Sequence, residues 1–133
     1  MSFKKVGSVI LIVSEMERSL VFYKDILGLP IKSQSKDWTE FFLSGTVLAL
    51  HPAGNKTKLK TGISMLVGFM VSDLETNIKK LKENKVKFFK EPKDEPFGRH
   101  SIIEDPDGHL ISIAEINTEP TEGFDLLGLI GAE

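Results

Sequence analysis

The sequence predicts an α+β fold built from two βαβββ modules, and three observations lead to this prediction. Residues 13–17 are similar to residues 71–75, which lie 58 positions further along the chain. Each copy follows a short apolar run and precedes a segment with helical spacing. Three extended segments then follow each helical segment. Internal similarity of this kind indicates that one supersecondary unit is used twice.

The first module opens with a strand and a helix. The apolar run at residues 9–13 predicts the strand, and the next segment has apolar residues at helical spacing. These residues are Leu20, Tyr23, Ile26 and Leu27. Ser14 is the predicted N-cap, because its side chain can accept hydrogen bonds from free amides of the first turn. Gly28 suits the end of the helix.

The second module repeats this pattern. The apolar run at residues 65–71 predicts its first strand, and Leu74, Ile78 and Leu81 form the apolar face of its helix. Ser72 is the predicted N-cap and Asn84 the predicted C-terminal stop.

Extended segments complete both modules. They comprise residues 31–33, 38–43 and 46–51 in the first module and 86–89, 99–104 and 110–116 in the second. Tight turns at residues 44–45 and 105–108 separate neighbouring strands, because their Ser, Gly, Asp and Pro residues favour turns.

This pattern predicts one domain over residues 1–117, with module one at about 5–52 and module two at about 62–117. Residues 118–133 form a C-terminal tail outside the repeat. Its segment 124–130 is apolar enough to dock on the domain or on a partner chain.

The composition excludes several functional classes. A net charge of −2 lacks the basic surface expected of a nucleic-acid-binding protein. The absence of cysteine excludes disulfides, thiolate metal sites and a cysteine nucleophile. We find neither a signal-peptide pattern nor an apolar run long enough to span a membrane. By elimination, we expect a cytoplasmic protein that contacts neither nucleic acid nor membrane.

The order of these motifs resembles the vicinal oxygen chelate superfamily, which includes glyoxalase I, extradiol dioxygenases and bleomycin-resistance proteins. The similar segments are residues 13–29, 71–74 and 105–108, and the resemblance covers about residues 5–117. It implies two βαβββ modules whose strands form an incomplete barrel around a cleft, often in a homodimer. It also implies either metal-dependent catalysis or metal-free binding of a small organic molecule.

The resemblance further implies where metal ligands would lie. Metal-dependent members place histidine, glutamine or glutamate at four strand positions, which here hold Ser8, Ala49, Leu66 and Ser112. Alanine and leucine have no donor atom, and a serine hydroxyl is a poor ligand for a divalent cation. Because a catalytic site needs about three imidazole or carboxylate ligands, we expect no metal cofactor. His51 and His100 belong to different modules, and His109 is expected to be exposed after its turn, so they suggest no substitute site.

The same four positions predict the lining of a ligand pocket. Side chains two residues apart on a strand share one face. The residues predicted to share the inner face are Ser8, Ile10, Ile12, Val47, Ala49, His51, Leu66, Gly68, Met70, Leu110, Ser112 and Ala114. A mainly apolar lining with few polar groups is typical of a small-molecule site. The alternative is that Ile10, Leu66 and Met70 fill a core that has no cavity.

A predicted hairpin adds an aromatic and an acidic residue to this inner face. If residues 44–45 form a two-residue turn, Glu40 lies opposite Ala49 and Trp38 lies opposite His51. Trp38 then either stacks on a planar ligand or fills the core. His51 is a candidate general base with Glu40 as its acid partner, or both are surface residues.

A second predicted hairpin adds Arg99. If Glu104 pairs with His109, Ser101 faces Ser112 and Arg99 turns inward beside Ala114, whereas a slip of one residue reverses both. An inward arginine binds a carboxylate or phosphate through two parallel hydrogen bonds. A surface arginine would need no such explanation.

These residues support three functional hypotheses. The first is a metal-independent binding protein that holds an apolar or aromatic small molecule in the barrel cleft. The second is a metal-independent isomerase or lyase that uses His51 with Glu40 or Arg99. The third is an interaction module that uses the tail. We favour the first, because the ligand positions have changed while the scaffold is retained, although a fold alone does not define function.

Overall fold

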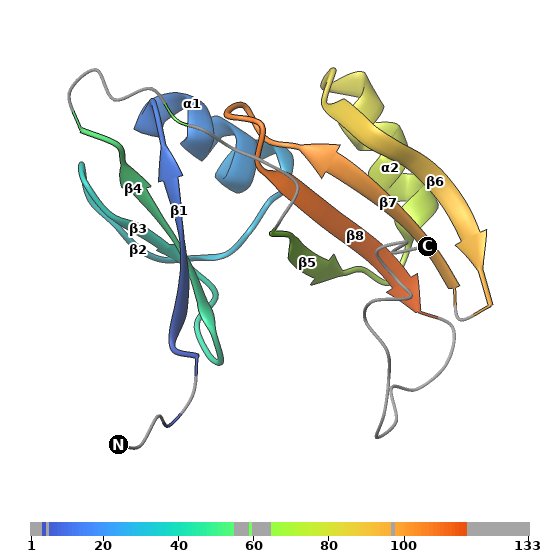
Figure 1. Ribbon diagram of the computed structural model, residues 1–133, viewed down its shortest axis with the longest axis horizontal. Helices are drawn as coiled ribbons and strands as arrows, with labels where there is room; N and C mark the ends of the chain where they lie inside the picture. Colours follow the sequence, from blue (N-terminus) through green and yellow to red (C-terminus); the bar gives the residue numbers. More distant parts are fainter. Residues whose placement is uncertain (1–3, 5, 55–58, 60–64, 97, 117–133) are drawn as a thin grey trace. The chain divides into compact units, whose positions relative to one another are not determined.

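The computed structural model describes residues 4, 6–54, 59, 65–96 and 98–116. The chain divides into two compact units, Met1–Lys60 and Thr61–Glu133, and each contains its own four-stranded sheet (Figure 1). No helix in the described part of the chain is long and apolar enough to cross a membrane. The apolar segment 124–130 lies outside the described residues.

The first sheet has the strand order β1-β4-β3-β2. Its central strand β4 (Val47–Pro52) runs parallel to β1 (Ser8–Val13) and antiparallel to β3 (Thr39–Phe41). The edge strand β2 (Ile31–Gln34) runs antiparallel to β3. β1 alternates as predicted: Ile10 and Ile12 are exposed, Val9 and Leu11 are half-buried, and Val13 is buried.

The second sheet repeats this order as β5-β8-β7-β6. Strand β8 (Leu110–Ile116) runs parallel to β5 (Val67–Met70) and antiparallel to β7 (Gly98–Glu104). β6 (Lys87–Glu95) is longer than predicted and continues through Pro92, which an edge strand tolerates. The prediction of an α+β fold with two βαβββ modules is confirmed, while the cleft enclosed by a barrel stays a prediction.

The first helix begins one residue later than predicted. α1 (Met16–Leu20) follows Glu15, which is the N-cap residue and makes no side-chain capping hydrogen bond. The prediction of Ser14 as N-cap is wrong, since its hydroxyl instead accepts a hydrogen bond from Arg18 Nη2 at 2.8 Å.

The second part of this helix, η1 (Val21–Ile26), is π-helical. Within η1, Phe22 is buried next to the predicted core residue Tyr23. Their ring centroids lie 4.9 Å apart in an edge-to-face arrangement. Gly28 has a φ of 70° after the helix, and its predicted role as the stop is confirmed.

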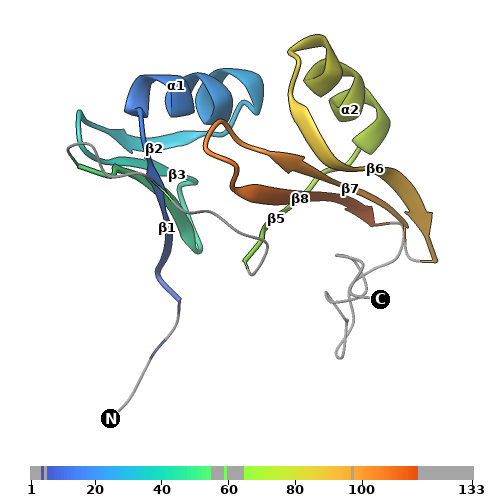
Figure 2. The ribbon, with the colours of Figure 1, turned by 45° about the horizontal axis from the view of Figure 1, so that its top comes forward.

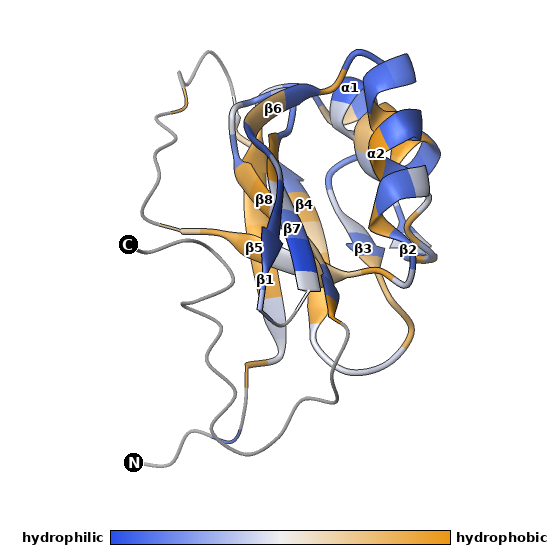
Figure 3. Ribbon diagram, turned by 90° about the vertical axis from the view of Figure 1, so that its right-hand side faces the viewer, coloured by the Kyte–Doolittle hydropathy of each residue, from blue (hydrophilic) through white to orange (hydrophobic). Residues whose placement is uncertain are grey.

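α2 (Leu74–Glu83) packs against the second sheet (Figure 2). Its three predicted core residues are buried, and Figure 3 shows β8 as largely hydrophobic. Ser72 is not the N-cap. Asp73 holds that position, and its carboxylate accepts hydrogen bonds from the Thr76 amide at 3.1 Å and the Thr76 hydroxyl at 2.7 Å. These bonds hold the pKa of Asp73 below its ordinary value of 3.8.

α2 ends in a left-handed residue that the sequence did not predict. Asn84 is the C-cap residue, in agreement with its predicted position, but the left-handed residue is Lys85, with a φ of 59°. The amide of Val86 donates to the Leu81 carbonyl at 3.0 Å. This bond is characteristic of a Schellman motif, in which glycine is the usual left-handed residue.

Candidate functional site

Contacts with α1 identify the two faces of the first sheet. The Thr39 hydroxyl lies 4.0 Å from the Met16 sulfur of α1, so Thr39 and its register partner Leu50 face the helix. Side chains alternate along a strand, and Glu40 and Ala49, the next register pair, therefore face away from α1. We call this second side the open face of the first sheet.

The predicted hairpin register is confirmed on the open face. Glu40 pairs with Ala49, and the rings of Trp38 and His51 lie 6.0 Å apart, centroid to centroid, at an angle of 72°. On the other side of β4, Ile10 pairs with Ala49. An indole, a carboxylate and an imidazole therefore lie beside an apolar surface.

Hydrogen bonds hold the indole in place. Trp38 Nε1 donates to Glu40 Oε2 at 2.8 Å, and the Ser33 hydroxyl donates to Glu40 Oε1 at 3.4 Å. Trp38 and Glu40 are both half-buried. Ser33 was not predicted as a site residue, although its pairing with Glu40 across β2 and β3 places it on the same face.

His51 is exposed, and its ring is held by the main chain. Its Nδ1 lies 2.7 Å from the carbonyl oxygen of Pro52. Because a carbonyl can only accept a hydrogen bond, Nδ1 carries the proton in this contact, and Nε2 of the neutral ring has a free lone pair.

Apolar side chains extend the open face along β1. Ile10 is 46% exposed and Ile12 is 40% exposed, while Ala49 between Ile10 and Glu40 is fully buried. Ser8, at the start of β1, pairs with Val47 and is exposed. The exposed isoleucines offer hydrophobic area to a bound molecule rather than a filled core.

The four positions that correspond to metal ligands do not fit a metal ion. Ser8 and Ala49 lie on the first sheet, and Ser112 pairs with Gly68 on the second. Leu66 is half-buried and precedes β5. Two neutral hydroxyls are the only side-chain donors of this set, and a divalent catalytic metal requires imidazole or carboxylate ligands.

The second hairpin differs from its prediction by one residue. The Asp105 amide donates to the His109 carbonyl at 2.9 Å, so Asp105 belongs to the ladder and the connection is a three-residue loop. Gly108, with a φ of 90°, closes this loop. Glu104 consequently pairs with Leu110 rather than with His109.

This shift turns every side chain of β7 to the opposite face. The predicted inward position of Arg99 is wrong: Arg99 pairs with Glu115, whose carboxylate accepts a hydrogen bond from the first residue of α2, Leu74, at 2.7 Å. Arg99 Nε lies 2.7 Å from Asp94 Oδ1. Likewise, Ser101 faces Ile113 and not Ser112, and its hydroxyl donates to the Lys90 carbonyl at 2.7 Å.

His100 takes the place predicted for Arg99. It pairs with Ala114 and is only 2% exposed. Its Nδ1 lies 3.7 Å from Glu95 Oε1, and Lys93 Nζ lies 3.9 Å from the same oxygen. This cluster was not predicted, because only the observed register places His100 on the same face as Ser112.

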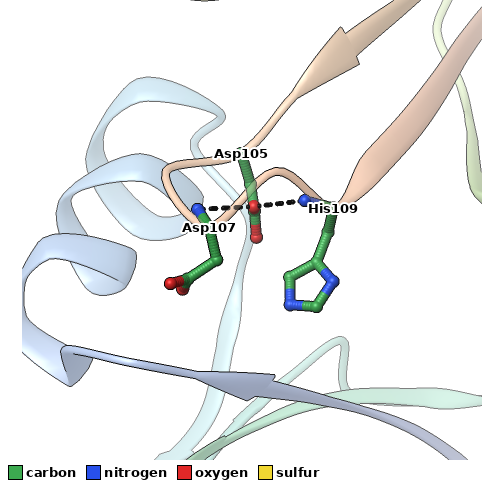
Figure 4. Close-up of side chains that lie close together, drawn as sticks. All are labelled: Asp105, Asp107 and His109. Atoms are coloured by element: carbon green, nitrogen blue, oxygen red, sulfur yellow. Dashed lines mark hydrogen bonds between the residues drawn. The ribbon is translucent and has the colours of Figure 1, made fainter. Parts of the chain in front are cut away.

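A second cluster lies in the turn after β7. Ligand atoms of Asp105, Asp107 and His109 lie within 4.8 Å of one another (Figure 4). Asp105 Oδ1 accepts hydrogen bonds from the amides of Asp107 at 2.9 Å and His109 at 2.8 Å. These bonds explain the cluster as a turn motif. The prediction that His109 is exposed is wrong, since it is half-buried immediately before β8.

The fold defines an α+β protein of paired βαβββ modules. Residues 5–113 match the family described as Glyoxalase/Bleomycin resistance protein/Dioxygenase superfamily, and the chain belongs to this family.

Relatives in this family include antibiotic-related proteins. The phenazine antibiotic resistance protein EhpR of Enterobacter agglomerans is 30% identical over 112 residues, which cover 79% of this chain and 87% of EhpR. TnmS3, an antibiotic binding protein from Streptomyces sp. CB03234, has a similar structure, with a TM-score of 0.69 at 22% identity over 88% of this chain and 99% of TnmS3. A glyoxalase/dioxygenase from Nostoc punctiforme gives a TM-score of 0.74 at 22% identity, over 86% of this chain and 92% of its own.

Proposed function

We propose that this protein binds a planar aromatic small molecule on the open face of the first sheet, without a metal ion. The observation that supports the proposal is the arrangement of Trp38, whose ring is fixed by Glu40 and flanked by His51. An indole held by a hydrogen bond loses little conformational entropy when a flat ligand stacks on it. The exposed Ile10 and Ile12 supply further apolar contact area.

The relatives narrow the class of ligand. EhpR is named for resistance to phenazine antibiotics and TnmS3 for antibiotic binding, and a phenazine is a flat tricyclic aromatic molecule. We therefore propose that the ligand of this chain is an aromatic antibiotic of phenazine-like shape, which the protein sequesters, and that it does so as a homodimer. Sedimentation of the purified protein tests the oligomeric state.

The chemistry of the four predicted ligand positions supports metal-independent binding. They offer only hydroxyl, methyl and isobutyl groups, so the proposed site relies on stacking and hydrogen bonds. The alternative of an isomerase or lyase receives less support. The two hydrogen bonds of Glu40 involve Trp38 and Ser33 rather than His51, and Arg99 faces the α2 side of its own sheet.

Calorimetric titration with phenazine tests the proposal. Stacking on an aromatic side chain contributes about 1–3 kcal/mol per ring system, so Trp38→Ala is expected to weaken binding by about 5- to 150-fold. Trp38→Phe retains a stacking ring and should retain most of the affinity. Leu43→Ala is the matched control, because Leu43 is 72% exposed outside the site.

Tryptophan fluorescence gives an independent measurement, because Trp38 is the only tryptophan in the chain. A ligand stacked on this ring should quench its emission at the concentrations at which heat is released. The proposal fails if phenazine does not bind, or if Trp38→Ala binds as tightly as the unchanged protein while its circular dichroism spectrum is native.

A further inference from the structure

We infer that Glu40 makes the proposed site selective for aromatic ligands that carry hydrogen-bond donors, such as amino groups or ring N–H groups, and disfavours carboxylated ones. This inference rests on the proposed function and specifies the chemistry of its ligand. It depends on which donors and acceptors remain available around Trp38.

The side-chain donors next to the Trp38 ring are already engaged. Trp38 Nε1–H donates to Glu40 at 2.8 Å, and the Ser33 hydroxyl donates to the same carboxylate at 3.4 Å. The Nδ1 proton of His51 is directed at the Pro52 carbonyl, 2.7 Å away. A bound molecule that offered only acceptors would therefore compete with hydrogen bonds that the protein makes within itself.

Acceptors remain free. A carboxylate has about four lone-pair positions, and the contacts with Trp38 and Ser33 use two of those of Glu40. When the His51 ring is uncharged and its Nδ1 donates to Pro52, the Nε2 lone pair adds another acceptor, on the residue whose ring lies 6.0 Å from the indole. Hydrogen-bond acceptors therefore lie beside a planar ligand that stacks on Trp38.

The charge of Glu40 acts in the same direction. Its register partners are Ala49 and Ser33, and within the residues that the structure describes no ion pair joins it to a basic side chain. An N–H group of a ligand gains a charge-assisted hydrogen bond here, which is stronger than a bond between neutral groups. A ligand carboxylate would be repelled and would leave Glu40 without a new partner.

Three probes of one ring system separate these effects: phenazine, a diaminophenazine and a phenazine monocarboxylate. Calorimetry should show that the diaminophenazine binds about tenfold more tightly than phenazine, and that the carboxylate binds more weakly than phenazine. In Glu40→Gln the side-chain oxygen still accepts from Trp38 Nε1, while the charge is removed and an amide donor is gained. The preference for the amino compound should fall to about twofold or less, and the affinity for unsubstituted phenazine should stay within about twofold.

Asp25→Asn is the matched control, because it removes one negative charge from an exposed position on η1 in the same unit. It should leave the order of the three affinities unchanged. This ratio of affinities distinguishes selectivity from loss of structure, which would weaken all three probes together.

The outcomes separate this inference from the proposed function. If phenazine does not bind, the proposed function fails. If phenazine binds through Trp38 but the carboxylate binds best, or if Glu40→Gln keeps the preference for the amino compound, only the inference about Glu40 is overturned. A preference that disappears in Glu40→Gln and persists in Asp25→Asn supports it.

Discussion

Replacing Gly98 by alanine is expected to destabilise the second unit strongly. Gly98 begins β7 with a φ of 149°, a conformation that residues with a side chain rarely adopt. A Cβ atom at this position would overlap the carbonyl oxygen of Glu115 on β8. It would also lie 3.0 Å from the carbonyl carbon of Glu115 and 3.1 Å from Cα of Ile116. Since all three atoms belong to the backbone, no side-chain rotation can relieve the overlap.

The expected magnitude has two parts. An alanine held in this backbone conformation costs about 1–3 kcal/mol. Separation of β7 from β8 at this end weakens one or two ladder hydrogen bonds, each worth about 1 kcal/mol. We therefore expect Gly98→Ala to lower the free energy of unfolding by about 2–5 kcal/mol. For a chain of 133 residues this corresponds to a fall of roughly 7–18 °C in Tm.

Thermal and urea unfolding followed by far-ultraviolet circular dichroism measure this effect. Gly68→Ala is the matched control: Gly68 also lies in a strand of the second sheet, but a Cβ there meets nothing within 4 Å. Its free energy of unfolding should be unchanged or up to about 1 kcal/mol higher, since an unstrained Gly→Ala change reduces the entropy of the unfolded chain. If Gly98→Ala unfolds at the same temperature as Gly68→Ala, the argument from backbone overlap is refuted.

Three further predictions each concern the substitution of one residue, and the midpoint of unfolding tests all of them. Lys85→Gly should stabilise the protein by about 1 kcal/mol, because glycine adopts the left-handed conformation at the end of α2 without strain; an unchanged or lower Tm would contradict this. Asp73→Ala should lower Tm at neutral pH. Because the folded-state pKa of Asp73 is lowered, its contribution is complete above the ordinary value of 3.8 and is lost as the pH falls through the lowered pKa, so the difference between variant and unchanged protein should shrink in acid. Asp105→Ala should cost about 2 kcal/mol, since two amide hydrogen bonds to a buried carboxylate are lost, while Asp105→Asn, which keeps an acceptor, should cost less. Equal losses in the two variants would exclude that explanation.

The sequence predicted the order of elements because apolar periodicity is a local signal. The strands, both helices and the pairing of Glu40 with Ala49 follow from spacing and from a short turn at 44–45. Helix boundaries were less predictable. Serine and aspartate both cap helices well, and only the observed backbone shows that Asp73 rather than Ser72 occupies the N-cap. The π-helical turn that buries Phe22 has no signal in a pattern of period 3.6.

The face on which each candidate site residue lies was predicted correctly only where the register of its hairpin was predicted correctly. On the first sheet, the hairpin register predicted from the sequence was correct, and it placed Trp38 beside His51. On the second sheet, the Asp105–His109 hydrogen bond shortened the loop by one residue. That choice depends on the energy of the turn rather than on hydrophobic pattern, because each face of β7 carries a buried isoleucine, Ile102 on one and Ile103 on the other. For this single reason, Arg99 was predicted on the face that His100 occupies.

The three-residue loop at Pro106, Asp107 and Gly108 has a consequence for how such proteins diverge. Adding or removing one residue there would shift the register of β7 against β8 by one residue and so move each β7 side chain to the opposite face of the sheet. The buried imidazole of His100 and the guanidinium of Arg99 would exchange faces. The side chains on one face of this sheet can therefore change through loop length alone, without any substitution in the strand. Evolution can alter such a surface by insertion and deletion as readily as by substitution.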